Sequence, residues 1–324
     1  MKYKRVAFLG PSFFSYIQNI KAAFEVKGFF SIYIDERASN SILYKILIRL
    51  NLSFIYKYYQ KYYEEKVFDM LLKNNIELIY FIDIEFISKN FLKRCKEKNI
   101  KLVLYMWDSH NNKPYFSKVL SYFDEISTFD YQDSNKFNMK LIPLFAEDDF
   151  KIDNSARNNT CVFLGTMHSK RIEVLKDLKV QLSNQNISLK PMLYYHSKFL
   201  FILKNIHKPL NLKYLFQINT NGFTKKTIGE SYKSSIYVFD LHHYKQSGLT
   251  SRTFEALRAG CILITYNENI NNLPLNLQQN CILVKSLKDK INFNKSPNKL
   301  TYEDDYFLSL ERFCDDLINL QKNV

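Results

Sequence analysis

The sequence predicts an α/β protein with two Rossmann-like doubly wound domains that face a cleft. Apolar segments of strand length alternate with helical segments through the first half, which indicates βαβ units and a parallel sheet. The same alternation restarts after a polar stretch at residues 147–160. A length of 324 residues fits two domains of roughly 150 residues each. The hydrophobic fraction of 46% is sufficient for a core in both.

The first half contains five apolar runs of strand length, with helical patterns between most of them. We expect strands at Val6–Leu9, Phe29–Ile34, Leu78–Ile82, Leu102–Trp107 and Ile126–Phe129. We expect helices at Tyr16–Lys27, Ile42–Lys73, Ile87–Lys98 and Tyr115–Phe123. A short apolar piece at Leu141–Phe145 then leads into the polar stretch, which we interpret as the domain boundary. The expected N-terminal domain therefore covers residues 1–147.

The second half repeats the pattern. We expect strands at Cys161–Leu164, Leu189–Tyr195, Ile236–Leu241, Cys261–Tyr266 and Cys281–Val284. Helices are expected at Lys170–Asn184, Ser251–Ala259 and Tyr302–Gln321, with a mixed helix and loop region at Ser197–Ile218. The expected C-terminal domain covers residues 148–300. Residues 301–324 form a last helix, for which packing back on the N-terminal domain is left open.

The composition limits the classes of partner. The net charge is +14, which attracts nucleic acid, anionic lipid or negatively charged small substrates. The basic residues are spread along the chain and no nucleic-acid recognition motif is present, so we expect no nucleic-acid partner. The five cysteines are widely spaced and form no CxxC pair. They therefore indicate neither a zinc site nor a disulfide framework, and we expect no metal and no cofactor.

The sequence predicts a cytoplasmic protein that could lie at the inner face of the cell membrane. No apolar run approaches the ~20 residues that cross a bilayer, and the opening MKYKRVAFLG is too short in its apolar part for a signal peptide. The segment Leu43–Tyr63 is basic, aromatic and amphipathic. It could lie in a membrane interface, with its cations near anionic headgroups: Lys45, Arg49, Lys57 and Lys61. A core helix with a solvated basic edge is the open alternative.

The most informative segment is Ser235–Tyr266, a strand, a polar loop, a short helix and a second strand. Thr250 or Ser251 can cap the helix, and Gly260 stands where a helix usually ends with positive φ. A helix start of this kind exposes backbone N–H groups and can bind phosphate. Glu255 is the helix's one acid and could accept hydrogen bonds from sugar hydroxyls. An ordinary strand–helix–strand unit is the alternative interpretation.

Other candidate residues follow predicted strands. Lys170 and Arg171 stand at a helix start, where cations oppose the helix dipole unless an anion is bound there. Asp108 follows a strong strand, where it could act as a base, orient a hydroxyl or cap the next segment. The weaker candidates are Gly10 in a tight turn, His242, which alternates onto one face with Asp240, and Gln246.

At these residues the chain resembles the GT-B glycosyltransferases, specifically the group-1-like (CgeB-like) branch of bacterial surface-polysaccharide and spore-coat clusters. The resemblance rests on YMWDS at Tyr105–Ser109, LIPLF at Leu141–Phe145, VFLGTMHSKR at Val162–Arg171 and QSGLTSRTFEALRAGCILIT at Gln246–Thr265. It implies nucleotide-sugar binding in the C-terminal half and acceptor binding in the N-terminal half. It also implies that Glu255 contacts the ribose and that the backbone of Gly248, Leu249, Thr250 and Ser251 receives the diphosphate, with Arg252 beside it. Lys170 and Arg171 match a basic position at the donor phosphates, and Asp108 matches an acid on the acceptor side.

The sequence departs from that family at one position. Many retaining members carry two glutamates eight residues apart, and Ser247 stands eight positions before Glu255. Gln246 could replace the missing glutamate as an uncharged hydrogen-bonding group. We expect a glycosyltransferase that moves a sugar from a nucleotide-sugar donor to a bacterial surface glycan: capsule, lipopolysaccharide or a lipid-linked precursor. A sugar-nucleotide epimerase of the same fold and an inactive membrane-surface partner protein are the alternatives.

Overall fold

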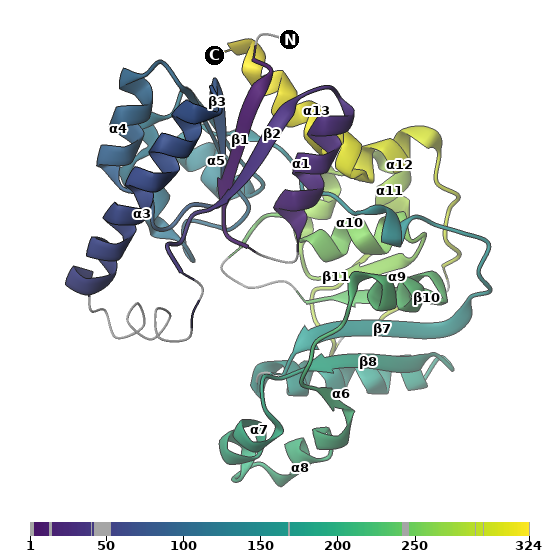
Figure 1. The fold of residues 1–324 in the computed structure, drawn as a ribbon. Helices are drawn as coiled ribbons and strands as arrows, with labels where there is room; N and C mark the ends of the chain where they lie inside the picture. The colour runs from purple at the N-terminus through teal and green to yellow at the C-terminus, as the bar shows by residue number, and fades with distance from the viewer. Residues whose placement is uncertain are drawn as a thin grey trace. The chain divides into compact units, whose positions relative to one another are not determined.

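The computed structural model describes residues 3–12, 15–39, 41, 53–167, 169–241, 246–288, 290–293 and 295–323. The chain divides into two compact units, each built on one β-sheet (Figure 1). The first unit comprises Met1–Pro143, Tyr244–Gly248 and Leu310–Val324. The second comprises Leu144–His243 and Leu249–Ser309. Among the described residues, the chain therefore crosses between the units at 143/144, 248/249 and 309/310.

The sheet of the first unit is parallel, with the strand order β2-β1-β3-β4-β5-β6. Its strands are β1 (Arg5–Gly10), β2 (Phe30–Asp35), β3 (Leu78–Ile82), β4 (Lys101–Met106), β5 (Glu125–Thr128) and β6 (Lys140–Leu141). Its helices include α1 (Tyr16–Val26), α3 (Ser53–Lys73), α4 (Lys89–Glu97), α5 (Tyr131–Phe137) and α13 (Leu310–Leu320). The strand order changes direction between β1 and β3, which is where doubly wound sheets bind ligands.

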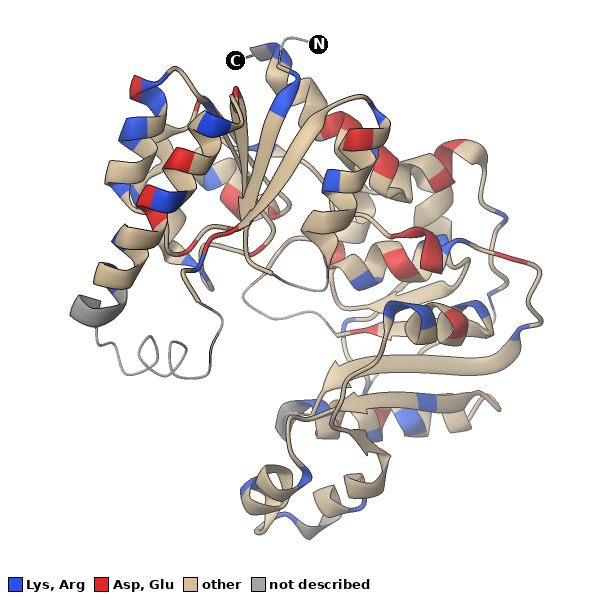
Figure 2. Cartoon of the chain, viewed as in Figure 1, with Lys and Arg blue, Asp and Glu red and all other residues tan. Residues whose placement is uncertain are grey.

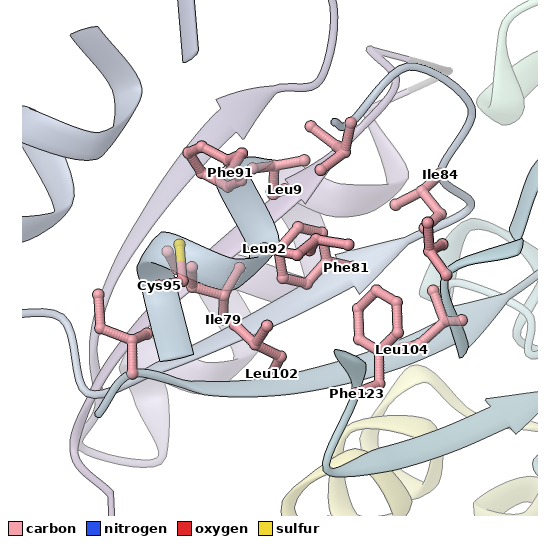
Figure 3. Packing of buried hydrophobic residues seen from close by; sticks show 14 of the residues in the cluster. Leu9, Ile79, Phe81, Ile84, Phe91, Leu92, Cys95, Leu102, Leu104 and Phe123 are labelled. Carbon is pink, nitrogen blue, oxygen red and sulfur yellow. The ribbon is translucent and has the colours of Figure 1, made fainter. Parts of the chain in front are cut away.

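The two faces of this sheet are covered by different helices because alternate strand residues point to opposite sides. On one face, Leu9, Ile79 and Phe81 pack with Phe91 and Leu92 of α4 (Figure 3). On the other face, Phe8 stacks on Tyr80 with ring centroids 5.2 Å apart, and the Tyr105 ring meets Phe313 of α13 edge-on at 5.0 Å. The Tyr80 hydroxyl donates to the Leu317 carbonyl at 3.1 Å. The last helix thus completes the core of the first unit.

The sheet of the second unit is also parallel, with the order β12-β11-β10-β7-β8-β9. Its strands are β7 (Asn158–Thr166), β8 (Ser188–Tyr194), β9 (Ile218–Asn219), β10 (Ser235–Asp240), β11 (Ile262–Thr265) and β12 (Cys281–Leu283). Its helices include α6 (Ser169–Ser183), α7 (Lys198–Asn205), α8 (Pro209–Leu212), α9 (Lys225–Lys233), α10 (Ser251–Arg258), α11 (Leu275–Gln279) and α12 (Tyr302–Leu308). These parallel sheets with their helices confirm the predicted doubly wound α/β class.

Two predicted helices differ from the structure. Residues Tyr115–Phe123 form two 3₁₀ turns, Pro114–Lys118 and Leu120–Tyr122, separated by Val119 with φ −130°. The helix expected at Tyr302–Gln321 breaks at Ser309, whose backbone is extended (φ −84°, ψ 158°). The break is caused by a strand-like bridge between Ser309 and Ala146, in which the Ala146 N–H donates to the Leu308 carbonyl at 2.8 Å.

The described part of the chain covers the long predicted helix at Ile42–Lys73 only from Ser53 onwards. Within the described ranges, no helix is long and apolar enough to cross a membrane. The turn expected at Gly260 is present, because this glycine has φ 71° directly after α10.

Candidate functional site

The strongest cluster of candidate residues lies at the carboxyl ends of two neighbouring strands of the second unit. β7 ends at Thr166 and its parallel neighbour β10 ends at Asp240. Each strand is followed by a helix start, Ser169 for α6 and Ser251 for α10. The carboxyl ends of parallel strands meet at one edge of a sheet, where ligands of such folds bind.

Two arginines are fixed to the end of β7. Arg171 Nη1 donates to the Thr166 carbonyl at 3.1 Å, and Arg252 Nη1 donates to the Leu164 carbonyl at 3.1 Å. Arg252 Nε also lies 3.4 Å from Asp240 Oδ1. Burial lowers the pKa of Arg171, and the nearby positive charge of Arg252 lowers it further. The two guanidinium groups repel each other, so a bound anion would be stabilised between or beside them.

Asp240 organises the start of α10 from the end of β10. This carboxylate is buried, and its Oδ2 accepts hydrogen bonds from the hydroxyls of Thr250 at 2.7 Å and Thr253 at 3.3 Å. Thr250 occupies the predicted N-cap position, but its side chain does not cap the helix because its hydroxyl binds Asp240 instead. The helix α10 has eight residues, and because no side chain caps its start, its first backbone N–H groups can bind an anion.

Glu255 lies one turn into α10 and is buried. It interacts electrostatically with Tyr232 of α9, a fully buried tyrosine whose hydroxyl has no hydrogen-bond partner within the described chain. Burial raises the pKa of Tyr232, and the Glu255 carboxylate raises it further. The Glu255 carboxylate, on the helix that contains Arg252, therefore lies near enough to the Tyr232 phenol of α9 to affect its pKa.

Gly248 belongs to the first unit, whereas Leu249 to Arg252 belong to the second. The Gly248 N–H donates to Asp130 Oδ2 at 3.0 Å, and Ser247 donates to Asp130 from both its N–H, at 2.7 Å, and its hydroxyl, at 2.6 Å. Asp130 also caps α5 by accepting from Gln132 N–H. A Cβ at Gly248 would lie only 2.4 Å from the Phe129 ring. In this structure the Gly248 N–H is therefore occupied by Asp130.

Asp108 follows β4 and closes the turn that comes after it. Its Oδ1 accepts hydrogen bonds from Ser109 N–H at 2.8 Å, Asn112 Nδ2 at 2.8 Å and Gln246 Nε2 at 2.7 Å. Asp108 and Gln246, predicted separately, are thus in direct contact. At Gly10 a Cβ would lie 2.3 Å from the Ile82 carbonyl oxygen, so close approach of β3 requires glycine there.

Two candidate positions lie outside what the structure describes. These are His242 and the side chain of Lys170.

The sequence analysis missed a buried charged group at the carboxyl edge of the first sheet. Glu36 follows β2 and Asp83 follows β3, and both side chains are buried. Asp83 Oδ2 lies 2.6 Å from Lys113 Nζ. Burial raises the pKa of Glu36 to about 7 and that of Asp83 to about 6. The signal was present in the sequence, since each acid directly follows an apolar strand, as Asp108 does.

The cysteines belong to the hydrophobic cores. All five are buried and none forms a disulfide, and burial raises the thiol pKa of Cys261 to about 12. Among the residues that the structure describes, no group of three or more His, Cys, Asp and Glu side chains could hold a metal ion.

No protein-family model matches the chain, and a search of curated proteins also finds no match. Solved structures do match. Anabaena HepE in complex with UDP-glucose is 10% identical, with a TM-score of 0.64 over 99% of this chain and 100% of that chain. A UDP-GlcNAc 2-epimerase from Methanocaldococcus jannaschii is 11% identical, with a TM-score of 0.61 over 99% and 100%. The lipopolysaccharide outer core galactosyltransferase WaaB is 13% identical, with a TM-score of 0.54 over 98% and 99%. The likeness extends over both units, and the chain therefore has the GT-B fold of two Rossmann-like domains, as its sequence predicted.

Proposed function

We propose that this protein is a glycosyltransferase that transfers a sugar from a nucleotide-sugar donor to a bacterial surface glycan or its lipid-linked precursor. The observation that carries the proposal is the pair of guanidinium groups, Arg171 and Arg252, fixed at the carboxyl edge of the second sheet beside the start of α10. Fold neighbours support a nucleotide-sugar donor, since HepE has been solved with UDP-glucose and WaaB is a galactosyltransferase.

The donor diphosphate would bind at this arginine pair. Its charge would relieve the repulsion between Arg171 and Arg252, and the first backbone N–H groups of α10 would bind its oxygens. The backbone of Leu249, Thr250 and Ser251 leads into this helix start, and Lys170 would add a further cation. Positive charge fixed in this way stabilises a nucleoside diphosphate leaving group without requiring a metal.

Glu255 would hold the ribose of the donor. A carboxylate accepts hydrogen bonds from paired hydroxyls, and Glu255 lies one turn beyond the helix start that would bind the diphosphate. The neighbouring Tyr232 hydroxyl, which has no partner in the described chain, could donate to the same carboxylate or to the sugar.

Acceptor binding is proposed for the first unit. Asp108, held by Ser109, Asn112 and Gln246, would orient or deprotonate the acceptor hydroxyl. Gly10 and His242 remain further cleft candidates suggested by the sequence.

We also retain the sequence-based proposal that residues 43–63 lie against the anionic inner face of the cell membrane. Residues 43–52 lie outside the described ranges. In the described part of α3, the side chains of Lys57, Tyr58, Lys61 and Tyr62 are exposed and recur at helical spacing. A basic and aromatic helix face of this kind is typical of interfacial helices.

The donor site is tested by thermal shift with UDP, UDP-glucose and UDP-GlcNAc on the wild type and on Arg252→Gln. Glutamine keeps a polar side chain at this position but removes the positive charge. Loss of a charged hydrogen bond to phosphate costs about 1.5–3 kcal/mol, which weakens nucleotide binding roughly 10- to 100-fold. Arg94→Gln is the matched control, because Arg94 forms an ion pair with Glu65 in the first unit. Equal nucleotide shifts in wild type and Arg252→Gln would refute the site.

The Glu255→Ala variant tests the ribose contact in the same screen, and an unchanged shift would remove that role. Product analysis then separates the alternatives. A sugar altered without an acceptor would identify an epimerase, which the fold neighbours include. No nucleotide shift in the wild type would favour an inactive partner protein.

A further inference from the structure

An exposed apolar surface lies on α7 and the following 3₁₀ turn of the second unit. Within α7 and the residue after it, Phe199, Leu200, Leu203 and Ile206 are 67%, 48%, 52% and 58% exposed, and Phe216 of the turn Leu215–Gln217 is 90% exposed. Positions 199, 200, 203 and 206 share one face of a helix, and the turn packs against α7. We call these five residues the α7 surface.

The α7 surface is not needed for the core. The opposite side of α7 supplies the core contact, since Phe201 is fully buried and meets the Tyr195 ring edge-on at 5.4 Å. Polar contacts also fix this region, because Asn211 Nδ2 donates to the Asn205 Oδ1 at 2.9 Å. The outward apolar side chains are therefore held in place while remaining exposed. A cluster of this kind usually marks an interaction surface.

The charge around the α7 surface has one sign. No Asp or Glu occurs between Asp177 and Glu230, whereas that interval contains eight lysines. Four of them are exposed on or beside α7 and the turn: Lys198, Lys204, Lys208 and Lys213. Figure 2 shows this region, at α7 and α8 of Figure 1, with blue segments and no red ones.

We propose that the α7 surface binds an anionic lipid bilayer. The aromatic and aliphatic side chains would enter the headgroup boundary, and the surrounding lysines would contact anionic headgroups. An anionic bilayer fits this surface better than a second copy of the chain does, because a contact between two copies through this face would place lysines against lysines. The inference does not depend on the proposed enzymatic function, and it concerns a different unit from the segment at residues 43–63.

The test is co-sedimentation of the full chain with vesicles of phosphatidylglycerol and phosphatidylcholine, compared with pure phosphatidylcholine. Two double variants disrupt the surface, Leu203→Ser with Phe216→Ser and Lys204→Glu with Lys208→Glu. All four side chains are exposed, so folding should be unaffected, and urea unfolding checks this. The charge variant loses the attraction of two lysines to anionic headgroups, and the apolar variant loses the burial of two side chains in the headgroup boundary, so each should weaken vesicle binding about tenfold or more.

Matched controls carry the same changes elsewhere. Leu275→Ser with Tyr302→Ser removes two exposed apolar side chains of the second unit. Lys118→Glu with Lys140→Glu removes the same net charge from exposed positions of the first unit. Both controls should bind the anionic vesicles as the wild type does. Equal loss in the charge control and in the α7 charge variant would show a net-charge effect and overturn the proposal.

Other outcomes also overturn it. Unchanged vesicle binding in both α7 variants would remove the α7 surface as the contact, and loss only in Lys57→Glu with Lys61→Glu would assign binding to α3 instead. A wild-type dimer in light scattering that the Leu203→Ser, Phe216→Ser variant abolishes would identify a second copy as the occupant. The nucleotide shift of the α7 variants should equal that of the wild type, so failure of this proposal and failure of the donor site are distinguishable.

Discussion

The buried carboxyl of Glu36 makes the stability of the first unit depend on pH in a calculable way. Glu36 is fully buried, and its Oε2 accepts hydrogen bonds from the N–H groups of Glu85 at 2.8 Å and Phe86 at 3.3 Å. Its Oε1 has no hydrogen-bond partner in the described chain. Burial raises its pKa from the ordinary 4.5 to about 7. The positive charge of Lys113 lowers this pKa and the negative charge of Asp83 raises it.

The direction of the pH effect follows from the raised pKa. The folded state binds the Glu36 proton more tightly than the unfolded state, so its contribution to stability is fully present below about pH 4.5 and is lost as the pH rises to about 7. Each pKa unit corresponds to 1.36 kcal/mol, so the increase in the pKa of Glu36 from 4.5 to about 7 corresponds to about 3 kcal/mol of folding stability. Glutamine at this position can accept the same two backbone hydrogen bonds and cannot ionise. The free energy of unfolding of Glu36→Gln, relative to that of the wild type, should therefore increase by about 3 kcal/mol between pH 4.5 and pH 8.

The measurement is urea unfolding of the full chain at several pH values, followed by the fluorescence of Trp107, the single tryptophan, which lies in the first unit. Asp83 titrates in both proteins, so its effect largely cancels from the difference. Glu97→Gln on α4 is the control, because Glu97 is exposed and its removal should leave the pH profile unchanged. Parallel profiles for Glu36→Gln and wild type would refute the reasoning.

Two further substitutions test contacts that fix the sites. Asp130→Ala should destabilise the first unit by about 2 kcal/mol or more, because it removes the cap of α5 together with the acceptor for Ser247 and Gly248. Asp130→Asn should retain part of this stability, and an Ala variant as stable as wild type in urea would contradict the assignment. Gly10→Ala should cost about 1–3 kcal/mol, because the added Cβ would meet the Ile82 carbonyl at 2.3 Å. An unchanged urea midpoint would show that β1 and β3 can separate without cost.

The strands were predictable because their signal is local. Buried parallel strands appear as continuous apolar runs, and β1, β3, β10 and β11 occur where those runs are. β6 and β9 have two residues each, too few for any pattern. The sequence analysis predicts no helix at α9, whose segment is largely polar and contains Gly229. The structure explains that glycine, since a Cβ there would lie 2.3 Å from the Asp149 carbonyl.

The candidate site also contains residues that the sequence predicted and a contact that it could not predict. Arg171 was predicted from its place at the start of a helix that follows a strand, whereas Arg252 was predicted only from the resemblance. The structure shows that the strands before these helices, β7 and β10, are neighbours. The partner of Gly248 was not predictable, because Asp130 lies 118 positions earlier and no local pattern connects them. The role that the resemblance implies for Gly248 and Arg252 in one phosphate loop stays a prediction.

Charged side chains hold the backbone close to the points where the chain changes unit. In the first unit, Asp130 binds Gly248, and Arg312 donates to the Pro143 carbonyl at 3.0 Å. In the second unit, Asp240 binds Thr250, and Arg258 donates to the Ala146 carbonyl at 2.9 Å. All four charged side chains are buried, so their charge-assisted hydrogen bonds are strong and leaving them unpaired would be costly. Apolar periodicity therefore accounts for where the strands and helices form, while buried polar contacts hold the segments on either side of these crossing points within their own units.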